Sequence, residues 1–405
     1  MKTIQTSILL SALALLSSTA LSDTYTLVSL SGDSANAENT LTFESFSTPR
    51  INESGQVAFG ARFEEGAAKE DSRFDAALVF DNATARILIN SGQQTTIAGS
   101  QVTLASVRGV AMTSNSDVAF VGAITGGAEV LLSASMRGDP AAPALELHLT
   151  NAQQPIVDYD GNLDPSRRHQ LLGNPSNLDA HAFSFISRLR TGTTPDATGY
   201  WVAELPASET DPLPTLRLLA LEGIAPKGDT LVIDKPLALS LNSSLEGGLL
   251  AILKDDDEIE NNNGQALWLL DDASASTLVA KTGDAAPGSA ETFQTFGKPT
   301  IDGSGNIFFW ASLLNDSEGE GLYLFSEGAL STLATSNAAI NVFGNDHSYS
   351  SFMDPAVNEN GALAVFATLA DEDGQAILTR SADGTWSILA QTGMLAPGTF
   401  GGVSF

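Results

Sequence analysis

The sequence predicts an all-β chain folded as a β-propeller of about six blades, and three observations lead to this fold class. A short motif recurs along the chain at a spacing of roughly 60 residues, which is the mark of a repeat architecture. The chain holds 36 Gly and 16 Pro, and no long stretch after the N-terminus has helical periodicity. Its 405 residues exceed the usual size of one hydrophobic core, whereas repeats need to pack only on their neighbours.

The recurring motif combines a strand entry, a turn and a short buried strand. In its first copy Pro49 lacks an N–H and so enters a strand, Asn52–Gly55 supplies turn chemistry, and Val57–Phe59 is the buried strand. Clear copies follow at Pro299–Phe309 and Pro355–Val365. Other repeats show the strand more weakly, at Val118–Phe120, Phe183–Phe185 and Gly248–Leu250, and the fourth repeat matches in its later strands and not in the motif.

Two further strands complete each repeat. A polar loop leads to a second strand such as Ala266–Leu269, and a third strand such as Thr277–Lys281 often ends in Thr-Gly. Three or four short antiparallel strands per repeat is the content of a propeller blade. Tyr25–Gly32 resembles a third strand, so the terminal pieces are expected to share one blade. There are about seven copies of the third strand against six of the first, so a seven-bladed propeller is also possible. The alternative fold is a β-solenoid, although one turn of a solenoid is usually much shorter than about 60 residues.

Residues 1–22 read as a secretory signal peptide. Lys2 gives the positive start, Ile8–Leu16 the apolar stretch, and Ala20–Ser22 a cleavage site of small residues. The apolar stretch is too short to span a bilayer, and no other stretch is long enough, so no membrane span is predicted. We therefore expect residues 23–405 to form a single exported repeat domain, in the periplasm or outside the cell. The chain has 0 Cys, so this export involves no disulfides.

The charge excludes one class of partner. With 48 acidic and 19 basic residues the formal net charge is −29, which opposes binding to nucleic acid or to an anionic membrane, because both need clustered Lys and Arg. The acidity favours solubility. No feature of the sequence indicates an oligomeric state.

Acidic residues gather in the loops between first and second strands. The richest loop holds Asp255, Asp257 and Glu260, and oxygen ligands of this kind suit Ca²⁺. These three residues are the predicted metal ligands, although their spacing differs from that of an EF-hand. The competing interpretation is a solvated turn on an acidic protein. The sequence indicates no other cofactor.

The second and third repeats concentrate basic residues in this acidic chain. Four residues there form a candidate catalytic set for β-elimination of an acidic polysaccharide, with His as base, Tyr as acid and Arg to neutralise a uronate carboxylate. They are His169, His181, Arg188 and Tyr200. His181 stands where the first motif has Gly55. The alternative is that the third repeat has drifted and its arginines pair with surface acids.

The motif carries a family resemblance. Asn52–Phe59 resembles the Asn-x-x-Gly-x-x-Ala-Phe tandem repeats of bacterial exported and surface proteins, in full, and the copies at Asp302 and Asn358 match in part. The resemblance covers nearly all of the mature chain and implies no reaction, so it assigns no catalytic residue. No Gly-x-Ser-x-Gly, His-Glu-x-x-His, Walker or Rossmann pattern is present.

The sequence therefore predicts a binding or scaffold module whose ligand is a glycan, another exported protein or Ca²⁺. Propellers present loops from all blades on a common face, which suits such a role. The alternative class is an enzyme acting on polysaccharide, such as a lyase that uses the His, Tyr and Arg residues of repeats two and three.

Overall fold

The computed structural model describes most of the chain after residue 40. The described ranges are 41–47, 49–51, 56–65, 73–81, 84–97, 100–113, 117–135, 145–150, 155–157, 163–173, 175–179, 182–191, 194–204, 215–254, 264–271, 276–314, 319–336, 338–342, 345–370 and 374–394. The expected signal peptide at residues 1–22, the strand expected at Tyr25–Gly32, and the candidate residues His181, Asp255, Asp257 and Glu260 lie outside these ranges.

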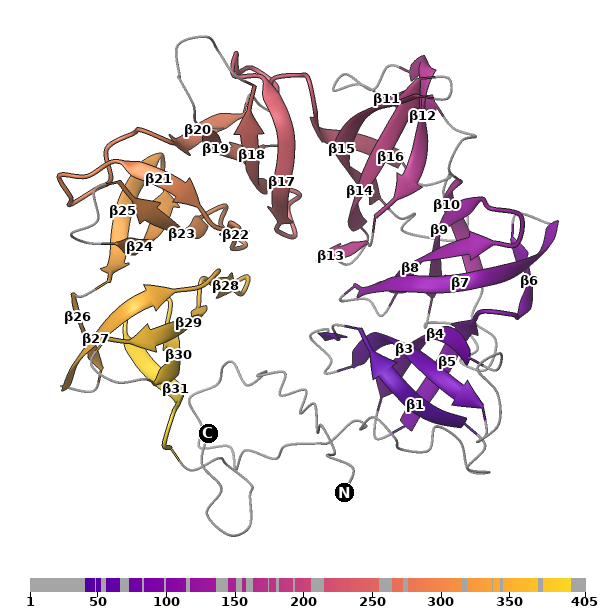
Figure 1. Ribbon diagram of the computed structural model, residues 1–405, viewed down its shortest axis with the longest axis horizontal. Coiled ribbons are helices and arrows are strands. Elements are labelled where there is room, and N and C mark those ends of the chain that lie inside the picture. Colours follow the sequence, from indigo (N-terminus) through magenta and orange to yellow (C-terminus); the bar gives the residue numbers. More distant parts are fainter. Residues whose placement is uncertain are drawn as a thin grey trace. The chain divides into compact units, whose positions relative to one another are not determined.

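Within the described ranges every regular element is a β-strand, and the strands form six sheets (Figure 1). Sheet one has the order β1 (Leu41–Phe46), β3 (Val57–Glu65), β4 (Arg73–Asp81), β5 (Thr84–Asn90), with β2 (Arg50–Ile51) beside β3. Sheet two has the order β10 (Leu145–Thr150), β9 (Glu129–Ser135), β8 (Asp117–Ile124), β7 (Ser100–Met112), β6 (Gln94–Ile97). Sheet three has the order β11 (Pro155–Val157), β12 (Leu163–Leu172), β14 (Ala182–Thr191), β15 (Thr194–Glu204), β16 (Thr215–Leu221), with β13 (Ser176–Asp179) beside β14.

The later sheets repeat this arrangement. Sheet four has the order β17 (Ile233–Leu241), β18 (Gly247–Leu253), β19 (Gln265–Leu270), β20 (Thr277–Lys281). Sheet five has the order β21 (Phe293–Phe296), β23 (Ile307–Leu313), β24 (Glu320–Ser326), β25 (Ala329–Thr335), with β22 (Thr300–Ile301) beside β23. Sheet six has the order β26 (Ala339–Val342), β27 (Asn345–Phe352), β29 (Leu363–Leu369), β30 (Gln375–Arg380), β31 (Trp386–Gln391), with β28 (Ala356–Val357) beside β29.

The predicted fold class is confirmed. Within the described ranges the sheets follow one another along the chain, each is an antiparallel meander, and there are six of them, which agrees with a β-propeller of about six blades. Antiparallel meanders of four or more strands do not fit the β-solenoid alternative. No helix in the described ranges is long and apolar enough to cross a membrane.

The chain divides into two compact units. The first comprises Met1–Asp196 and Trp201–Leu218, and the second comprises Ala197–Tyr200 and Leu219–Phe405. Sheets one and two belong to the first unit and sheets four, five and six to the second. The expectation of one domain over residues 23–405 stays a prediction.

Each sheet carries a β-bulge at the same place in its first long strand. In sheet five Phe293 pairs with Leu313 and Thr295 pairs with Ser312, so Gln294 is the extra residue. The residue before this bulge, here called the pre-bulge residue, is buried in every sheet. The six pre-bulge residues are Phe43, Leu104, His169, Ile233, Phe293 and Tyr349. Bulges increase local twist, so this shared bulge shapes each blade in the same way.

Hydrophobic cores lie between consecutive sheets inside each unit. Between sheets four and five, Leu250 and Leu267 pack against Phe293, Phe309 and Tyr323. The rings of Phe293 and Tyr323 meet edge to face with centroids 5.0 Å apart. Full burial of a Phe or Leu side chain is worth about 1.5–3 kcal/mol, so the alternating apolar residues of each strand hold neighbouring sheets together.

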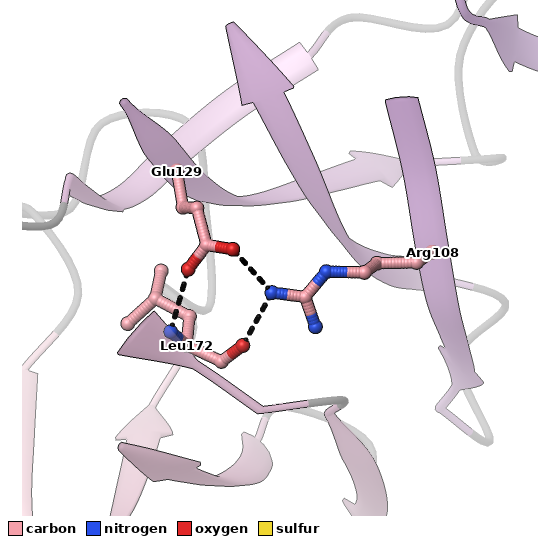
Figure 2. Close-up of polar contacts among 3 residues, drawn as sticks. All are labelled: Arg108, Glu129 and Leu172. Carbon is pink, nitrogen blue, oxygen red and sulfur yellow. Dashed lines mark hydrogen bonds and ion pairs between the residues drawn. The ribbon is translucent and has the colours of Figure 1, made fainter. Parts of the chain in front are cut away.

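A recurring polar bond also joins consecutive sheets. The acceptor is a Glu or Gln that begins β9, β19 or β24. The donor is a backbone N–H at the end of the first long strand of the next sheet, which is β12, β21 or β27. The bonds run from Leu172 to Glu129 at 2.7 Å, from Phe296 to Gln265 at 2.8 Å and from Phe352 to Glu320 at 3.0 Å. In the first unit Arg108 completes the junction, because one guanidinium nitrogen donates to both Glu129 Oε1 and the carbonyl oxygen of Leu172, each at 2.6 Å (Figure 2).

The Thr-Gly pair that ends several third strands also has a structural role. The hydroxyl of Thr282 accepts the N–H of Gln265 at 3.0 Å, and that of Thr392 accepts the N–H of Gln375 at 2.9 Å. The following glycine, Gly283, has a φ of 90°, which an L-residue rarely adopts. The pair therefore closes the second and third strands together and turns the chain toward the next blade.

Candidate functional site

His169 lies at the pre-bulge position of sheet three, inside the protein. Its side chain is 0% exposed, and its Nδ1 atom lies 2.7 Å from the hydroxyl oxygen of Ser187 on the neighbouring strand. The ring meets Trp201 edge to face, with centroids 4.9 Å apart. Its Nε2 atom is buried without a hydrogen-bond partner. His169 therefore fills a position that the other repeats give to an aliphatic or aromatic side chain.

Ser187 is also polar where the other repeats are apolar. Ser187 lies two residues before Leu189, the strand partner of the pre-bulge residue, and so faces the same side of the sheet. In the other five sheets the residues at this position are small. They are Ala61, Gly122, Ala251, Ala311 and Ala367. In sheet three both members of the pair are polar, and they bond to each other. The third repeat therefore differs from the others at two contacting positions rather than at one.

Burial sets the charge state of His169. Desolvation by burial lowers its pKa from the ordinary 6.5 to about 4, because the charged imidazolium loses its contact with water. The imidazole is therefore neutral at neutral pH. A side chain without exposed surface does not reach a polymer in solution unless sheet three opens.

Arg188 lies on the other face of the same sheet. Ser187 and Leu189 point into the core beside His169, and since side chains alternate along a strand, Arg188 between them points outward. Arg188 is exposed and pairs across the strands with Leu171, which is 52% exposed. The sheet therefore separates His169 from Arg188 and does not bring these two predicted catalytic residues together.

The remaining predicted site residues are placed only in part. Tyr200 lies in β15, half-buried, and burial raises its pKa to about 12, so its phenol is protonated at neutral pH. His181 and the predicted calcium ligands fall outside the described ranges. Among the residues that are described, no group of three or more His, Asp or Glu is arranged to hold a metal ion. The catalytic set and the calcium site stay predictions.

The motif turns of the second unit form a second candidate site. Each runs over five residues, Asn242–Glu246, Asp302–Asn306 and Asn358–Ala362, and all three have the same hydrogen bonds. Oδ1 of Asp302 accepts the N–H groups of Ser304 and Asn306, both at 2.9 Å. Asn242 and Asn358 bind their own turns in the same way, at 2.9–3.1 Å. The Asn or Asp of the motif is thus the residue that organises the turn.

The fourth repeat does not match the motif in sequence, yet it makes the same turn. Asn242 makes the turn, but Leu245 occupies the place of the motif's glycine with a φ of 63°. Leu241 pairs with Gly247 as Ile301 pairs with Ile307, so the motif's aromatic corresponds to Leu249 rather than Leu250. Sequence reasoning missed the turn because it looked for glycine, whereas the Asn was the informative residue.

The second repeat uses a hydroxyl at the same place. The N–H of Thr113 donates to the carbonyl oxygen of Asp117 at 2.8 Å, and the Thr113 hydroxyl accepts the N–H of Asp117 at 3.0 Å. Threonine therefore replaces the motif's Asn there. A search for any residue with a short side-chain oxygen would have found this copy.

Neighbouring motif turns of the second unit are tied to one another. The amide of Asn242 donates to the carbonyl oxygen of Asp302 at 2.9 Å, and the N–H of Gly303 donates to that of Glu359 at 3.0 Å. The hydroxyl of Ser243 donates to Glu359 Oε2 at 3.1 Å, which links the turns of sheets four and six directly. The ends of β17, β22 and β28 accordingly lie side by side (Figure 1).

Above these bonds the turns present an exposed polar surface. We call this surface the turn face, and its members are Ser243, Ser244, Ser304, Glu359 and Asn360. Beneath it, Asn242 is 0% and Asp302 3% exposed and Asn358 is half-buried, while the presented groups are in solvent. Hydroxyl, amide and carboxylate groups on a fixed backbone can donate and accept hydrogen bonds to a polar ligand with little loss of conformational entropy.

Comparison with known proteins gives one family. The sequence model of a family described as a family of unknown function, DUF7453, matches residues 11–136 and 178–405. A comparison with curated proteins gives no match.

Several solved structures are similar at low identity. The acylaminoacyl peptidase of Pyrococcus horikoshii is 10% identical with a TM-score of 0.35, over 85% of this chain and 52% of the peptidase, so the chain spans about half its length. The periplasmic gluconolactonase of Pseudomonas aeruginosa is 11% identical with a TM-score of 0.37, over 85% and 84% of the two chains. The lectin of Aleuria aurantia, a six-bladed β-propeller that recognises fucose, is 10% identical with a TM-score of 0.31, over 85% and 93%. No function is transferred from these structures.

Proposed function

The chain belongs to the family of unknown function DUF7453, and we propose from its own geometry that it is an exported binding module whose turn face holds a glycan. The observation that carries the proposal is the set of bonds that ties three motif turns into one support beneath exposed polar groups. Export rests on residues 1–22, and the expected mature chain begins at Asp23.

The chemistry of the turn face suits sugar hydroxyls. Ser304 and Asn360 are exposed, and only their backbone N–H groups take part in the turn bonds, which leaves their side chains available for a ligand. Glu359 adds an acceptor whose position the Ser243 hydroxyl holds. Preorganised groups of this kind favour binding because less freedom is lost when the ligand arrives.

Glycan-array binding by the secreted mature protein tests the proposal. The double variant Ser304→Ala and Asn360→Ala removes two presented groups without touching the turn bonds, and a loss of affinity of about tenfold is expected. Thr277→Ala, an exposed position on β20, is the matched control and should bind as the unaltered protein does. Binding that is equal in all three proteins would place the glycan elsewhere, and no binding to any glycan would leave an exported protein as the ligand to seek.

The same preparations separate a binding module from a lyase. Incubation with an acidic polysaccharide should leave the ultraviolet absorbance unchanged, because a binding module creates no unsaturated sugar ends. A rise in absorbance that His169→Phe abolishes would replace the proposal with the lyase alternative. Titration with Ca²⁺ that raises the melting temperature would add the predicted calcium site in the loop of Asp255, Asp257 and Glu260.

A further inference from the structure

Sheet three gathers arginines on one face in a chain that has few basic residues. Arg188 and Arg190 lie on β14, and Arg168 lies on the adjacent β12. Since Leu189 points into the core, its neighbours Arg188 and Arg190 share the opposite face, and Arg168 joins them because it pairs directly with Arg190. The whole chain holds only 19 Lys and Arg against 48 acids, so this grouping runs against its composition.

The arrangement places like charges close together. Side chains directly opposite on antiparallel strands have Cβ atoms about 5 Å apart, and like charges there are destabilising. Arg168 and Arg190 are such a pair. The Nε atom of Arg190 is also buried without a hydrogen-bond partner. An oxyanion placed beside Arg188 and Arg190 would accept bonds from their guanidinium groups.

In sheet one the residue equivalent to Arg188 is an arginine whose charge is neutralised by an aspartate. Arg62 occupies in β3 the place that Arg188 occupies in β14, and its Nε atom donates to Asp75 Oδ1 at 2.9 Å. Thr198 is the counterpart of Asp75 in the third repeat. The N–H of Asp75 donates to the side chain of Ser91 just after β5, and the N–H of Thr198 donates to the side chain of Glu222 just after β16. Among the described residues neither Arg188 nor Arg190 forms an ion pair. The third repeat thus keeps the cation and lacks its acid.

From these observations we propose that the outward face of Arg168, Arg188 and Arg190 binds a linear acidic polysaccharide through its carboxylate groups. Arg188 and Arg190 are two positions apart on one strand, which sets their Cα atoms about 7 Å apart and suits successive anionic groups along a polymer. Leu171, 52% exposed and paired with Arg188, offers an apolar surface beside the charges for the carbon-bound face of a sugar ring. The proposal concerns the first unit and is independent of the turn face.

Titration calorimetry with polygalacturonate at low ionic strength tests this site. The unaltered protein should bind, and raising the salt to about 0.5 M should abolish binding, because screening weakens exposed charge pairs. Arg188→Gln, at an exposed position that leaves the core intact, should weaken binding about tenfold. Arg62→Gln is the matched control, and it should bind as the unaltered protein does because that guanidinium is already paired with Asp75.

Other outcomes overturn the proposal. Equal binding by Arg188→Gln and the unaltered protein would remove the site, and so would equal binding of a neutral dextran. Inorganic sulfate that competes at the same concentration of anionic groups would show a simple oxyanion site and overturn the polymeric ligand. The turn-face double variant Ser304→Ala and Asn360→Ala should still bind polygalacturonate, so failure of one proposal is distinguishable from failure of the other.

Discussion

The backbone N–H of Leu172 in sheet three donates to Oε2 of Glu129 in sheet two at 2.7 Å, and the other carboxylate oxygen is held by Arg108 (Figure 2). Glu129 is only 14% exposed in its side chain, so its bonds are partly shielded from water. The equivalent bonds of Gln265 and Glu320 show that an acceptor at this place is a general device for joining consecutive sheets of one unit.

Two substitutions of Glu129 should therefore distinguish the contribution of its hydrogen-bond acceptor from that of its negative charge. Glu129→Ala leaves the Leu172 N–H without its acceptor and Arg108 without this carboxylate, so the free energy of unfolding should fall by about 1–3 kcal/mol. Glu129→Gln keeps an acceptor, as Gln265 does, and should lose less. Urea unfolding of both variants measures the order, and a Gln variant as unstable as the Ala variant would show that the charge, not the acceptor, holds the junction.

His169 predicts a pH dependence of stability. Its folded pKa of about 4 lies below the ordinary 6.5, so between these values the unfolded chain binds a proton that the folded protein does not. The contribution is fully present above about pH 6.5 and is lost as the pH falls toward 4, by about 3 kcal/mol in total.

The double variant His169→Phe and Ser187→Ala isolates this effect, because it restores the pair that sheet five has in Phe293 and Ala311. It should be at least as stable as the unaltered protein at pH 7, since it also removes the unpartnered Nε2 atom. Its advantage in the midpoint of urea unfolding should grow between pH 6.5 and 4. Parallel pH profiles for the two proteins would contradict a buried neutral histidine.

Gly303 should be intolerant of a side chain. A Cβ atom there would lie 2.5 Å from Glu359 Oε2 and 2.8 Å from the Glu359 carbonyl oxygen, which is itself held by the Gly303 N–H. Gly303→Ala should therefore push the turns of sheets five and six apart and lower the free energy of unfolding by about 1–3 kcal/mol. Gly328→Ala, where nothing lies within 4 Å of the added atom but φ is 77°, is a control that reports backbone strain alone. Since Gly303 has no positive φ, a Gly303→Ala variant as stable as the unaltered protein would mean that the contact between turns adds nothing.

How much of this the sequence could predict depends on which force fixes each feature. The motif strand, the second and third strands and the turn that the motif's Asn or Asp organises follow from local residue preferences, and they were predicted. The sheets hold four to six strands, which in most repeats is more than the three or four expected. The burial of His169 was not, because histidine suggests a surface or a catalytic site. Aligning the residue at a fixed distance before each motif would have set it beside Phe43, Leu104, Ile233, Phe293 and Tyr349 and indicated a core position. That Arg188 faces away from His169 follows from the register of β12 and β14 and its bulge, which no local pattern specifies.

Leu245 carries the last prediction, because it is strained where its counterparts are not. Its φ of 63° corresponds to 79° at both Gly305 and Gly361, and only glycine adopts this region without a steric cost of about 1–2 kcal/mol. Leu245→Gly should relieve that strain and, after the added entropy of the unfolded chain, raise the free energy of unfolding by about 0.5–1 kcal/mol. Gly361→Ala is the reverse test and should destabilise, since its Cβ would also lie 3.0 Å from Asp302 Oδ2. Thermal unfolding of both variants checks the pair, and a lower melting temperature for Leu245→Gly would mean that contacts of the leucine side chain outweigh the strain of its backbone.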